Sequence, residues 1–278
     1  MQRTLFENLK PMIETVFLFW FFFFGAAIGS FLNVVVYRLP LGKSLSYPPS
    51  HCPICSHPIR WYDNVPVVGW LHLGGKCRDC KSPISVRYPL IEGVCGVATA
   101  LFTFLLFQYR IVPPDILATN LVTPTGLDEP LPPIESVFSL LTIYTVLFYT
   151  LLTAGLIEYD GHRVPVTLFV PLIIMVLGTP FLCGAVTILP VKEMLLGSTF
   201  AVIFSAVYIV PRKTQIGWIL SLALIGAVLG PFPAIIVALA TNAILVPVLF
   251  LAKKNNLSYL ILTGTTFALI VALFFVSS

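Results

Sequence analysis

Charged residues are scarce in this chain. Asp, Glu, Lys and Arg make up 10% of its 278 residues, whereas hydrophobic residues make up 58%. Soluble domains carry roughly 25% charged residues, so the shortage excludes an ordinary soluble domain and predicts a polytopic membrane protein in a lipid bilayer. The net charge of +4 gives no reason to expect a nucleic acid partner, because the position of basic residues relative to the apolar spans decides their role.

Other features are missing as well. The N-terminus has mixed charge, with Arg3 and Glu7, and the apolar run after it is long, so no cleavable signal peptide is evident. We find no internal repeat. Asp and Glu are absent from residues 194–278, so the later apolar stretches lack the ionisable groups that line transport pathways. A transporter or channel remains an alternative, because proline-split helices are compatible with one.

About eight apolar stretches approach the ~20 residues that a bilayer core requires. They cover approximately residues 16–36, 91–107, 137–157, 166–189, 194–210, 216–229, 232–251 and 259–276. We therefore predict an all-α polytopic membrane protein with about eight transmembrane helices. Gly230, Pro231 and Pro233 divide one long apolar stretch into the sixth and seventh of these helices, because Pro and Gly favour a turn there.

The basic residues predict the orientation of these helices. If the N-terminus is outside and the loops alternate, 12 of the 16 Lys and Arg residues fall inside, as the positive-inside rule requires. Both termini are then outside, and the segment between the first two helices is cytosolic. Residues 108–136, which are rich in proline and carry several acids, become an irregular external loop.

Two Cys-x-x-Cys pairs lie in that cytosolic segment, at Cys52 and Cys55 and at Cys77 and Cys80. Each pair can hold a tetrahedral ion from a single turn, and together they supply four thiolate ligands. We predict a small zinc-binding lobe with a structural ion, because four thiolates leave no position for water. The alternatives are two disulfides, which a reducing compartment disfavours, and four unrelated thiols, which two matched pairs make improbable. The other two cysteines lie in apolar runs and are expected to be packing residues.

Several residues near the membrane edge have expected partners. Residues 25–30 are mostly small and predict close helix packing. Asn33 lies within the first apolar run and is expected to form an interhelical hydrogen bond. Arg38 stands where a snorkelling anchor belongs. Glu92 enters the second helix, where we expect an ion pair with Arg38 or Arg87 to tie the lobe to the membrane.

The third helix ends in the sequence LIEYDGHRVP, at residues 156–165. Glu158 and Asp160 are carboxylates at the membrane surface and are therefore functional candidates. Paired carboxylates can share a proton and activate water, but residues two apart do not face each other on a helix. The alternative is that both are solvated loop charges paired with His162 and Arg163.

The chain resembles, almost end to end, the bacterial prepilin leader peptidase/N-methyltransferases, which are membrane aspartic proteases of type IV pilus and type II secretion systems. In the N-terminal section the resemblance is carried by GSFLNVVVYRLP, CPxC, WYDNVPVVGWL, CRDC and ISVRYPLIE. LIEYDGHRVP resembles the first protease motif, and LIGAVLGP at residues 224–231 resembles the tail of the second. The resemblance assigns residues 1–90 to a first helix plus zinc lobe and residues 91–278 to a peptidase-like membrane domain.

The resemblance also implies a location in the bacterial inner membrane and a prepilin-like substrate helix, or other pilus or secretion components, as partners. It implies S-adenosylmethionine as a methyl donor, although no glycine-rich fingerprint for that cofactor is legible in the sequence. The family's aspartic protease chemistry requires two catalytic Asp residues, one from each protease motif.

This chain departs from the family at both catalytic positions. The motifs place Glu158 at the first Asp and Trp218 at the second, and the only carboxylate after Asp160 is Glu193, which the predicted topology puts outside. Losing the acid/base partner removes about 10²–10⁴-fold of rate. We therefore predict a pseudoenzyme whose protease activity is absent or very weak. The alternatives are an active peptidase that uses Glu158 with Asp160, and a non-enzymatic binding or regulatory protein.

Overall fold

The computed structural model describes residues 2–109, 134–182, 194–199, 215–230 and 258–276, with a few single positions between them. Within these ranges the chain forms helices and no β-strand, which confirms the all-α prediction for this part of the chain. Cys183 and Glu193 lie outside the described residues, as does most of the predicted loop at 108–136.

Three of the described helices are long and apolar enough to cross a membrane: Glu14–Leu41, Arg87–Leu105 and Leu141–Tyr159. Three shorter apolar helices cover Val166–Gly178, Gly217–Leu229 and Ile261–Ala272. All six coincide with stretches expected from the sequence. The stretches expected at 194–210 and 232–251 fall mostly outside the described residues, so the total of about eight helices stays a prediction.

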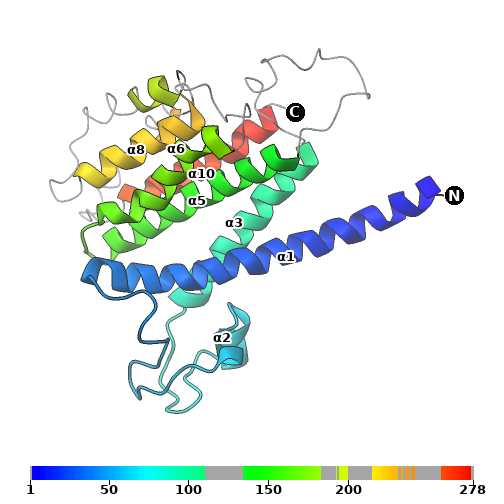
Figure 1. The fold of residues 1–278 in the computed structure, drawn as a ribbon. Helices are drawn as coiled ribbons and strands as arrows, with labels where there is room; N and C mark the ends of the chain where they lie inside the picture. Colours follow the sequence, from blue (N-terminus) through cyan, green and yellow to red (C-terminus); the bar gives the residue numbers. More distant parts are fainter. Residues whose placement is uncertain are drawn as a thin grey trace. The chain divides into compact units, whose positions relative to one another are not determined.

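The chain divides into two compact units, Met1–Phe104 and Leu105–Ser278. The first unit contains α1 (Gln2–Arg38), η1 (Leu39–Leu41), η2 (Trp61–Asn64), α2 (Val68–His72) and most of α3 (Arg87–Tyr109). We call residues 42–86, which connect η1 to α3, the Cys lobe; it contains little regular structure apart from η2 and α2 (Figure 1).

Small residues let α1 and α3 approach closely. A Cβ atom added to Gly29 would lie 2.9 Å from the Cβ of Cys95, and one added to Gly96 would lie 2.8 Å from the ring of Phe22. Cys95 is fully buried in this contact, as expected for a packing residue. The predicted small-residue face of the first helix is therefore present, and larger side chains at these glycines would push the helices apart.

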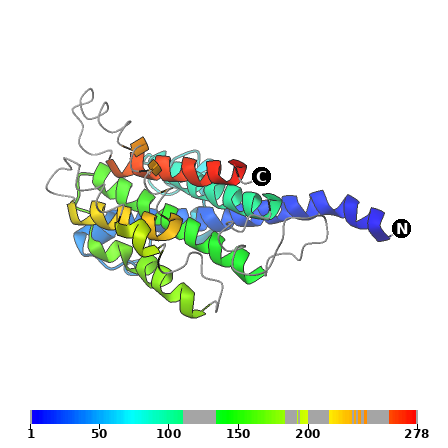
Figure 2. The same ribbon diagram turned by 90° about the horizontal axis from the view of Figure 1, so that it is seen from above.

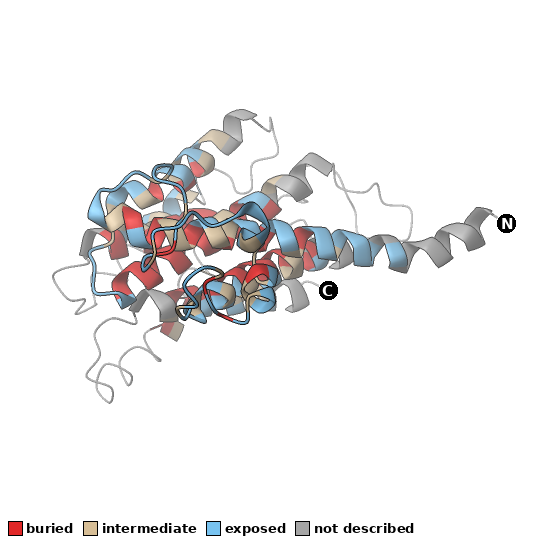
Figure 3. Ribbon diagram, turned by 90° about the horizontal axis from the view of Figure 1, so that it is seen from below, coloured by how far each residue is buried: buried red, intermediate tan, exposed pale blue. Residues whose placement is uncertain are grey.

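Side chains between residues 14 and 24 of α1 are largely exposed, and Figure 3 draws the part of α1 that follows its grey N-terminal end mostly in pale blue. Phe17, Phe19, Trp20 and Phe24 are all exposed. An exposed row of aromatic side chains on a long apolar helix is what contact with lipid requires, because such a surface would be unfavourable in water.

The second unit contains α5 (Ile134–Tyr159), η3 (Val166–Phe169), α6 (Val170–Leu182), α8 (Gln215–Leu229) and α10 (Ser258–Val276). The helices α5 and α10 run side by side in both views (Figure 1, Figure 2), and the rings of Phe148 and Phe267 lie 5.3 Å apart between them. Most of α5 is buried. This unit therefore has an apolar helical core centred on α5.

Candidate functional site

The four paired cysteines come together in the Cys lobe. Their Sγ atoms all lie within 4.8 Å of one another; Cys52 and Cys80 are 3.8 Å apart, and Cys55 and Cys77 are 4.0 Å apart. Tetrahedral ligands at ~2.3 Å from zinc lie ~3.8 Å from each other. All four are free thiols, so the structure forms no disulfide among them. The group therefore fits a tetrahedral metal ion.

The two pairs are built on the same turn. Each pair is followed by a residue with a φ of 59°, Ser56 after the first pair and Lys81 after the second. The N–H of Ser56 donates to the carbonyl of Cys52 at 2.9 Å, and the N–H of Lys81 donates to the carbonyl of Cys77 at 3.1 Å. The N–H of Cys52 donates to the carbonyl of His57 at 3.0 Å, and that of Cys77 donates to the carbonyl of Ser82 at 2.8 Å. The sequence Cys-x-x-Cys-x-x-Pro, which begins at both 52 and 77, accompanies this shared turn.

Hydrogen bonds favour the thiolate form of two of these cysteines. The backbone N–H of Cys55, helped by that of Ile54, lowers the pKa of Cys52 to about 6. The hydroxyl of Ser82, 3.0 Å from the Sγ of Cys80, lowers the pKa of Cys80. Metal ions bind the thiolate rather than the thiol, so these donors favour metal binding at Cys52 and Cys80.

The insert between the pairs closes onto the second pair. Arg78 donates from Nε and Nη2 to both carboxylate oxygens of Asp63, at 2.7 and 2.6 Å. This pairing holds the pKa of Asp63 below its ordinary value, and the Asp63 side chain is only 5% exposed. The indole of Trp70 donates to the carbonyl of Ile84 at 3.1 Å. The motif WYDNVPVVGWL therefore fixes the path of the chain between the two metal-binding turns.

Glu92 joins the Cys lobe to α3, but not through an ion pair. Its Oε2 accepts a 2.6 Å hydrogen bond from the backbone N–H of Val67, and the hydroxyl of Ser30 also bonds to it. The expectation of an ion pair with Arg38 or Arg87 was wrong. Val67 has φ 61° and ψ −52°, which is strained for a β-branched residue, and the bond to Glu92 stabilises that turn.

Two residues of α1 also contact other segments of the first unit. The amide of Asn33 donates to the carbonyl of Tyr88 on α3 at 3.4 Å, which confirms the expected interhelical bond. Arg38 does not snorkel toward water: the residue is 9% exposed, and its guanidinium donates to backbone carbonyls of Ser44 and Pro48 at 3.1 and 2.7 Å. These acceptors could not be predicted from the sequence, because the loop that supplies them has no regular pattern.

The two candidate carboxylates sit at the end of α5 in different surroundings. Gly161, with φ 80°, ends the helix: its N–H donates to the carbonyl of Glu158, and the N–H of His162 donates to that of Ile157. This is the Schellman pattern. Glu158 lies in the last turn and is 4% exposed, whereas Asp160 follows the turn and is exposed. Glu158 is therefore not the solvated loop charge of our alternative interpretation.

The position assigned to the second catalytic acid is part of an apolar core. Trp218 on α8 is 1% exposed and is the largest of the fully buried side chains. Further along α8, Gly226 packs against the backbone at Gly197, and the hydroxyl of Ser198 donates to the carbonyl of Ala223 at 3.1 Å. The segment that resembles the tail of the second protease motif thus serves close helix packing here. Among the described residues, only the four-Cys group gathers enough ligands for a metal ion.

Comparison with known proteins agrees with the resemblance of the motifs. Residues 23–107 match the family model of the bacterial peptidase A24 N-terminal domain. The chain is 43% identical over 126 residues to the prepilin leader peptidase/N-methyltransferase of Myxococcus xanthus, over 44% of this chain and 37% of that protein. It is 47% identical over 91 residues to that of Klebsiella pneumoniae, over 31% of this chain and 40% of the relative.

The chain is also similar to the type 4 prepilin-like proteins leader peptide-processing enzyme of Escherichia coli, at 44% identity over 95 residues, 28% of this chain and 35% of that protein. The matched parts thus span two fifths or less of the length of these curated relatives. No solved structure matches the chain.

Proposed function

We propose that this chain, whose residues 23–107 belong to the bacterial peptidase A24 N-terminal domain family, is a prepilin peptidase-like protein of the bacterial inner membrane. It keeps the family's metal lobe and has lost most or all aspartic protease activity. The observation that carries the loss is Trp218, a buried indole where the resemblance places the second catalytic acid. An indole has no carboxylate and cannot share a proton with Glu158.

The remaining acids offer little replacement. Residues 194–278 contain no Asp or Glu, so the helices after Glu193 supply no second carboxylate. Glu158 keeps one buried carboxyl, and a single carboxyl cannot act at once as the acid and the base of a two-carboxylate mechanism. The chain would then bind a prepilin-like helix of a pilus or secretion system, or regulate an active paralogue, without cleaving it.

The metal in the Cys lobe is proposed to be a single structural zinc ion. Four thiolates at tetrahedral spacing suit zinc, and the support comes from the Sγ distances of 3.8 and 4.0 Å. With all four positions taken by protein, the ion has no site for substrate, so it would stabilise the lobe rather than take part in a reaction.

The test of this function is processing of a type IV prepilin co-expressed in a host that lacks its own peptidase. We expect the prepilin to keep its leader when this chain is the only candidate enzyme. A relative with both catalytic Asp residues serves as the positive control. A shortened, N-methylated pilin would show that the enzyme is active, and a shortened but unmethylated one would show that protease activity alone survives.

A second function is favoured by the different surroundings of Glu158 and Asp160, one buried and the other exposed. Carboxyls in unlike environments can divide the roles of acid and base, so an active peptidase with unusual acids is the competing proposal. It predicts that cleavage is present and is lost in Glu158→Gln and in Asp160→Asn. Cleavage unaffected by either substitution would trace to another protease in the preparation.

A further inference from the structure

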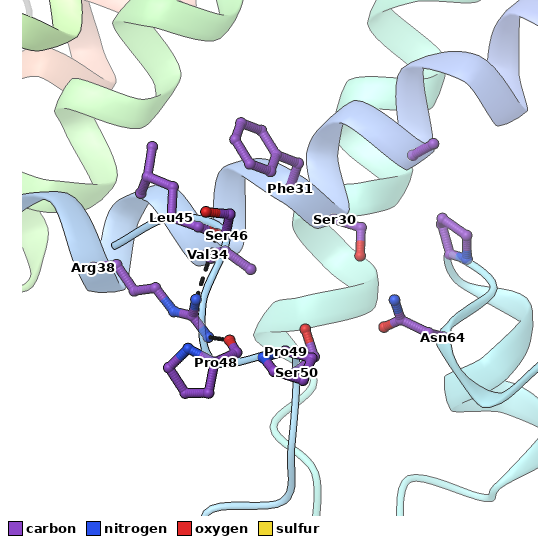
Figure 4. A pocket seen from close by; sticks show the side chains of 12 residues that line it. Ser30, Phe31, Val34, Arg38, Leu45, Ser46, Pro48, Pro49, Ser50 and Asn64 are labelled. Carbon is purple, nitrogen blue, oxygen red and sulfur yellow. Dashed lines mark hydrogen bonds between the residues drawn. The ribbon is translucent and has the colours of Figure 1, made fainter. Parts of the chain in front are cut away.

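A cavity of about 330 Å³ lies within the first unit, between α1 and two segments of the Cys lobe (Figure 4). One wall is a face of α1, formed by residues at helical spacing from Ala27 to Arg38. The other wall is formed by residues 45, 46 and 48–50 together with Asn64 and Pro66. None of the four metal-binding cysteines lines it.

Arg38 brings a positive charge to this cavity without a matching negative one. Its guanidinium bonds are to the carbonyls of Ser44, Leu45 and Pro48, at 3.1, 3.4 and 2.7 Å. All three acceptors are neutral, and in the described part of the chain no carboxylate pairs with Arg38. A guanidinium has five N–H donors, so the carbonyls leave donor capacity unused. A buried cation without a counter-charge is unfavourable, so the cavity favours an anion.

The rest of the lining indicates what kind of anion fits. Figure 4 shows the hydroxyls of Ser46 and Ser50 on the wall that faces Arg38, and hydroxyl groups donate hydrogen bonds to phosphate oxygens. Phe31 and Val34 give the α1 wall an apolar section, which suits the carbon atoms attached to a phosphate ester. Guanidinium groups bind phosphate strongly because two N–H donors match two of its oxygens.

The place of the cavity along α1 indicates a source for the phosphate. The apolar span ends at Leu41, three residues after Arg38, so the cavity lies at the depth where lipid headgroups meet water. Basic residues near the end of a span commonly meet anionic headgroups. A volume of about 330 Å³ is enough for a headgroup phosphate and its nearest carbons, but not for acyl chains, which would extend along the exposed apolar face of α1.

We propose that this cavity is a binding site for a phosphate ester, supplied by an anionic phospholipid, with Arg38 as the charged ligand and Ser46 and Ser50 as hydroxyl donors. The site is separate from the proposed loss of protease activity and does not depend on it. A soluble phosphate is the other source of the same chemistry, and the experiment distinguishes the two.

The test uses the full-length chain in a neutral detergent and follows its thermal unfolding during titration with phosphatidylglycerol, phosphatidylcholine or inorganic phosphate. We expect phosphatidylglycerol to raise the unfolding temperature saturably and phosphatidylcholine to do so little. Arg38→Gln, whose amide can still donate to the loop carbonyls, should bind phosphatidylglycerol ~10-fold more weakly, since it loses the charge that strengthens hydrogen bonds to a phosphate. Lys43→Gln, a change at an exposed neighbouring cation, should leave binding unchanged.

A second variant keeps the conclusion clear if Arg38→Gln fails to fold. Val34→Trp fills the cavity from the α1 wall while keeping the charge of Arg38, and should abolish the stabilisation while leaving the unfolding temperature without lipid near that of the wild type. Stabilisation by inorganic phosphate as well, lost in Val34→Trp, would support the site with a soluble phosphate as its ligand. Equal stabilisation of the wild type and Val34→Trp by phosphatidylglycerol would overturn the proposal.

Discussion

The Cys lobe differs from the region formed by α8 and the end of α5 in the polar groups that it brings together. In the Cys lobe, four thiols are gathered by two copies of one turn, and a bidentate ion pair braces the loop between them. On α8, the position that the sequence resemblance assigns to a second catalytic acid holds the buried indole of Trp218. The first region gathers polar ligands, and under the proposed function the second uses an apolar side chain for packing in place of a reactive group.

The difference has a physical reason. A four-Cys site stabilises the fold by binding its metal, so losing a ligand is penalised in folding itself. A buried catalytic carboxylate does the opposite: it costs free energy to desolvate and is retained only when the reaction is needed. Once cleavage is no longer required, an apolar side chain at such a position stabilises the protein. The contrast between the two regions can be tested by substituting a metal ligand of the Cys lobe and the buried indole of α8.

The largest effect is expected from the metal ligands. Cys77→Ser should reduce the zinc content from one ion per chain to nearly none and prevent the Cys lobe from folding, because structural zinc contributes on the order of 10 kcal/mol to such lobes. Metal analysis of the purified chain measures this directly. Cys95→Ala is the matched control, since Cys95 is buried but is not part of the group. A metal content that Cys77→Ser leaves unchanged would rule out the four-Cys site.

The next largest effect is expected at Trp218. Trp218→Ala should destabilise the second unit by about 3–5 kcal/mol, because it removes a fully buried aromatic side chain from an apolar core. Ile219→Ala, the exposed neighbour on α8, should cost far less. Thermal unfolding in detergent compares the two. If Trp218→Ala left stability unchanged, the indole would not be a packing residue and the contrast with the Cys lobe would fail.

The sequence predicted the Cys lobe better than its surroundings. The four cysteines could be identified because their spacing is fixed by the turn that holds each pair. The repeat of that turn was also legible, since both pairs are followed by Pro at the same distance. The partners of Arg38, and Val67 as a partner of Glu92, were not predictable. They are backbone groups in irregular loops, and the residue type of a partner does not reveal a bond to its backbone.

The helices were predictable for a related reason. Apolar runs long enough to span a bilayer predict helices from composition alone, and the described helices agree with six of those expected. The burial of Glu158 was harder to foresee, because it depends on α5 extending to Tyr159 before Gly161 ends it. Extending the helix by even one turn decides whether a carboxylate near its end faces the core or the solvent.

A smaller effect is expected inside the Cys lobe, at its internal ion pair. Asp63→Asn should lower stability by about 1.5–3 kcal/mol, because it weakens two charge-assisted hydrogen bonds from Arg78 to a buried carboxylate. Asp79→Asn is the matched control: its bond to Arg60 is 3.4 Å long and lies at the surface, where such pairs contribute about 0–1 kcal/mol. Equal losses in the two variants would show that the insert does not depend on the Asp63–Arg78 pair.

The smallest effect is the pH dependence of the same pair. Arg78 lowers the pKa of Asp63 below its ordinary value of 3.8, so the folded state favours the ionised form. The stabilisation is therefore complete above that ordinary value and is lost as the pH falls below 3.8 through the pKa of the folded protein. Metal release also destabilises the lobe in acid, and it contributes in both variants because each keeps the four metal-binding cysteines. The stability difference between these two variants should consequently be constant from pH 7 to about pH 5 and shrink below about pH 4. Denaturant unfolding at each pH measures this difference. A difference that stays constant at low pH would show that the Asp63 carboxylate does not stabilise the lobe through its charge.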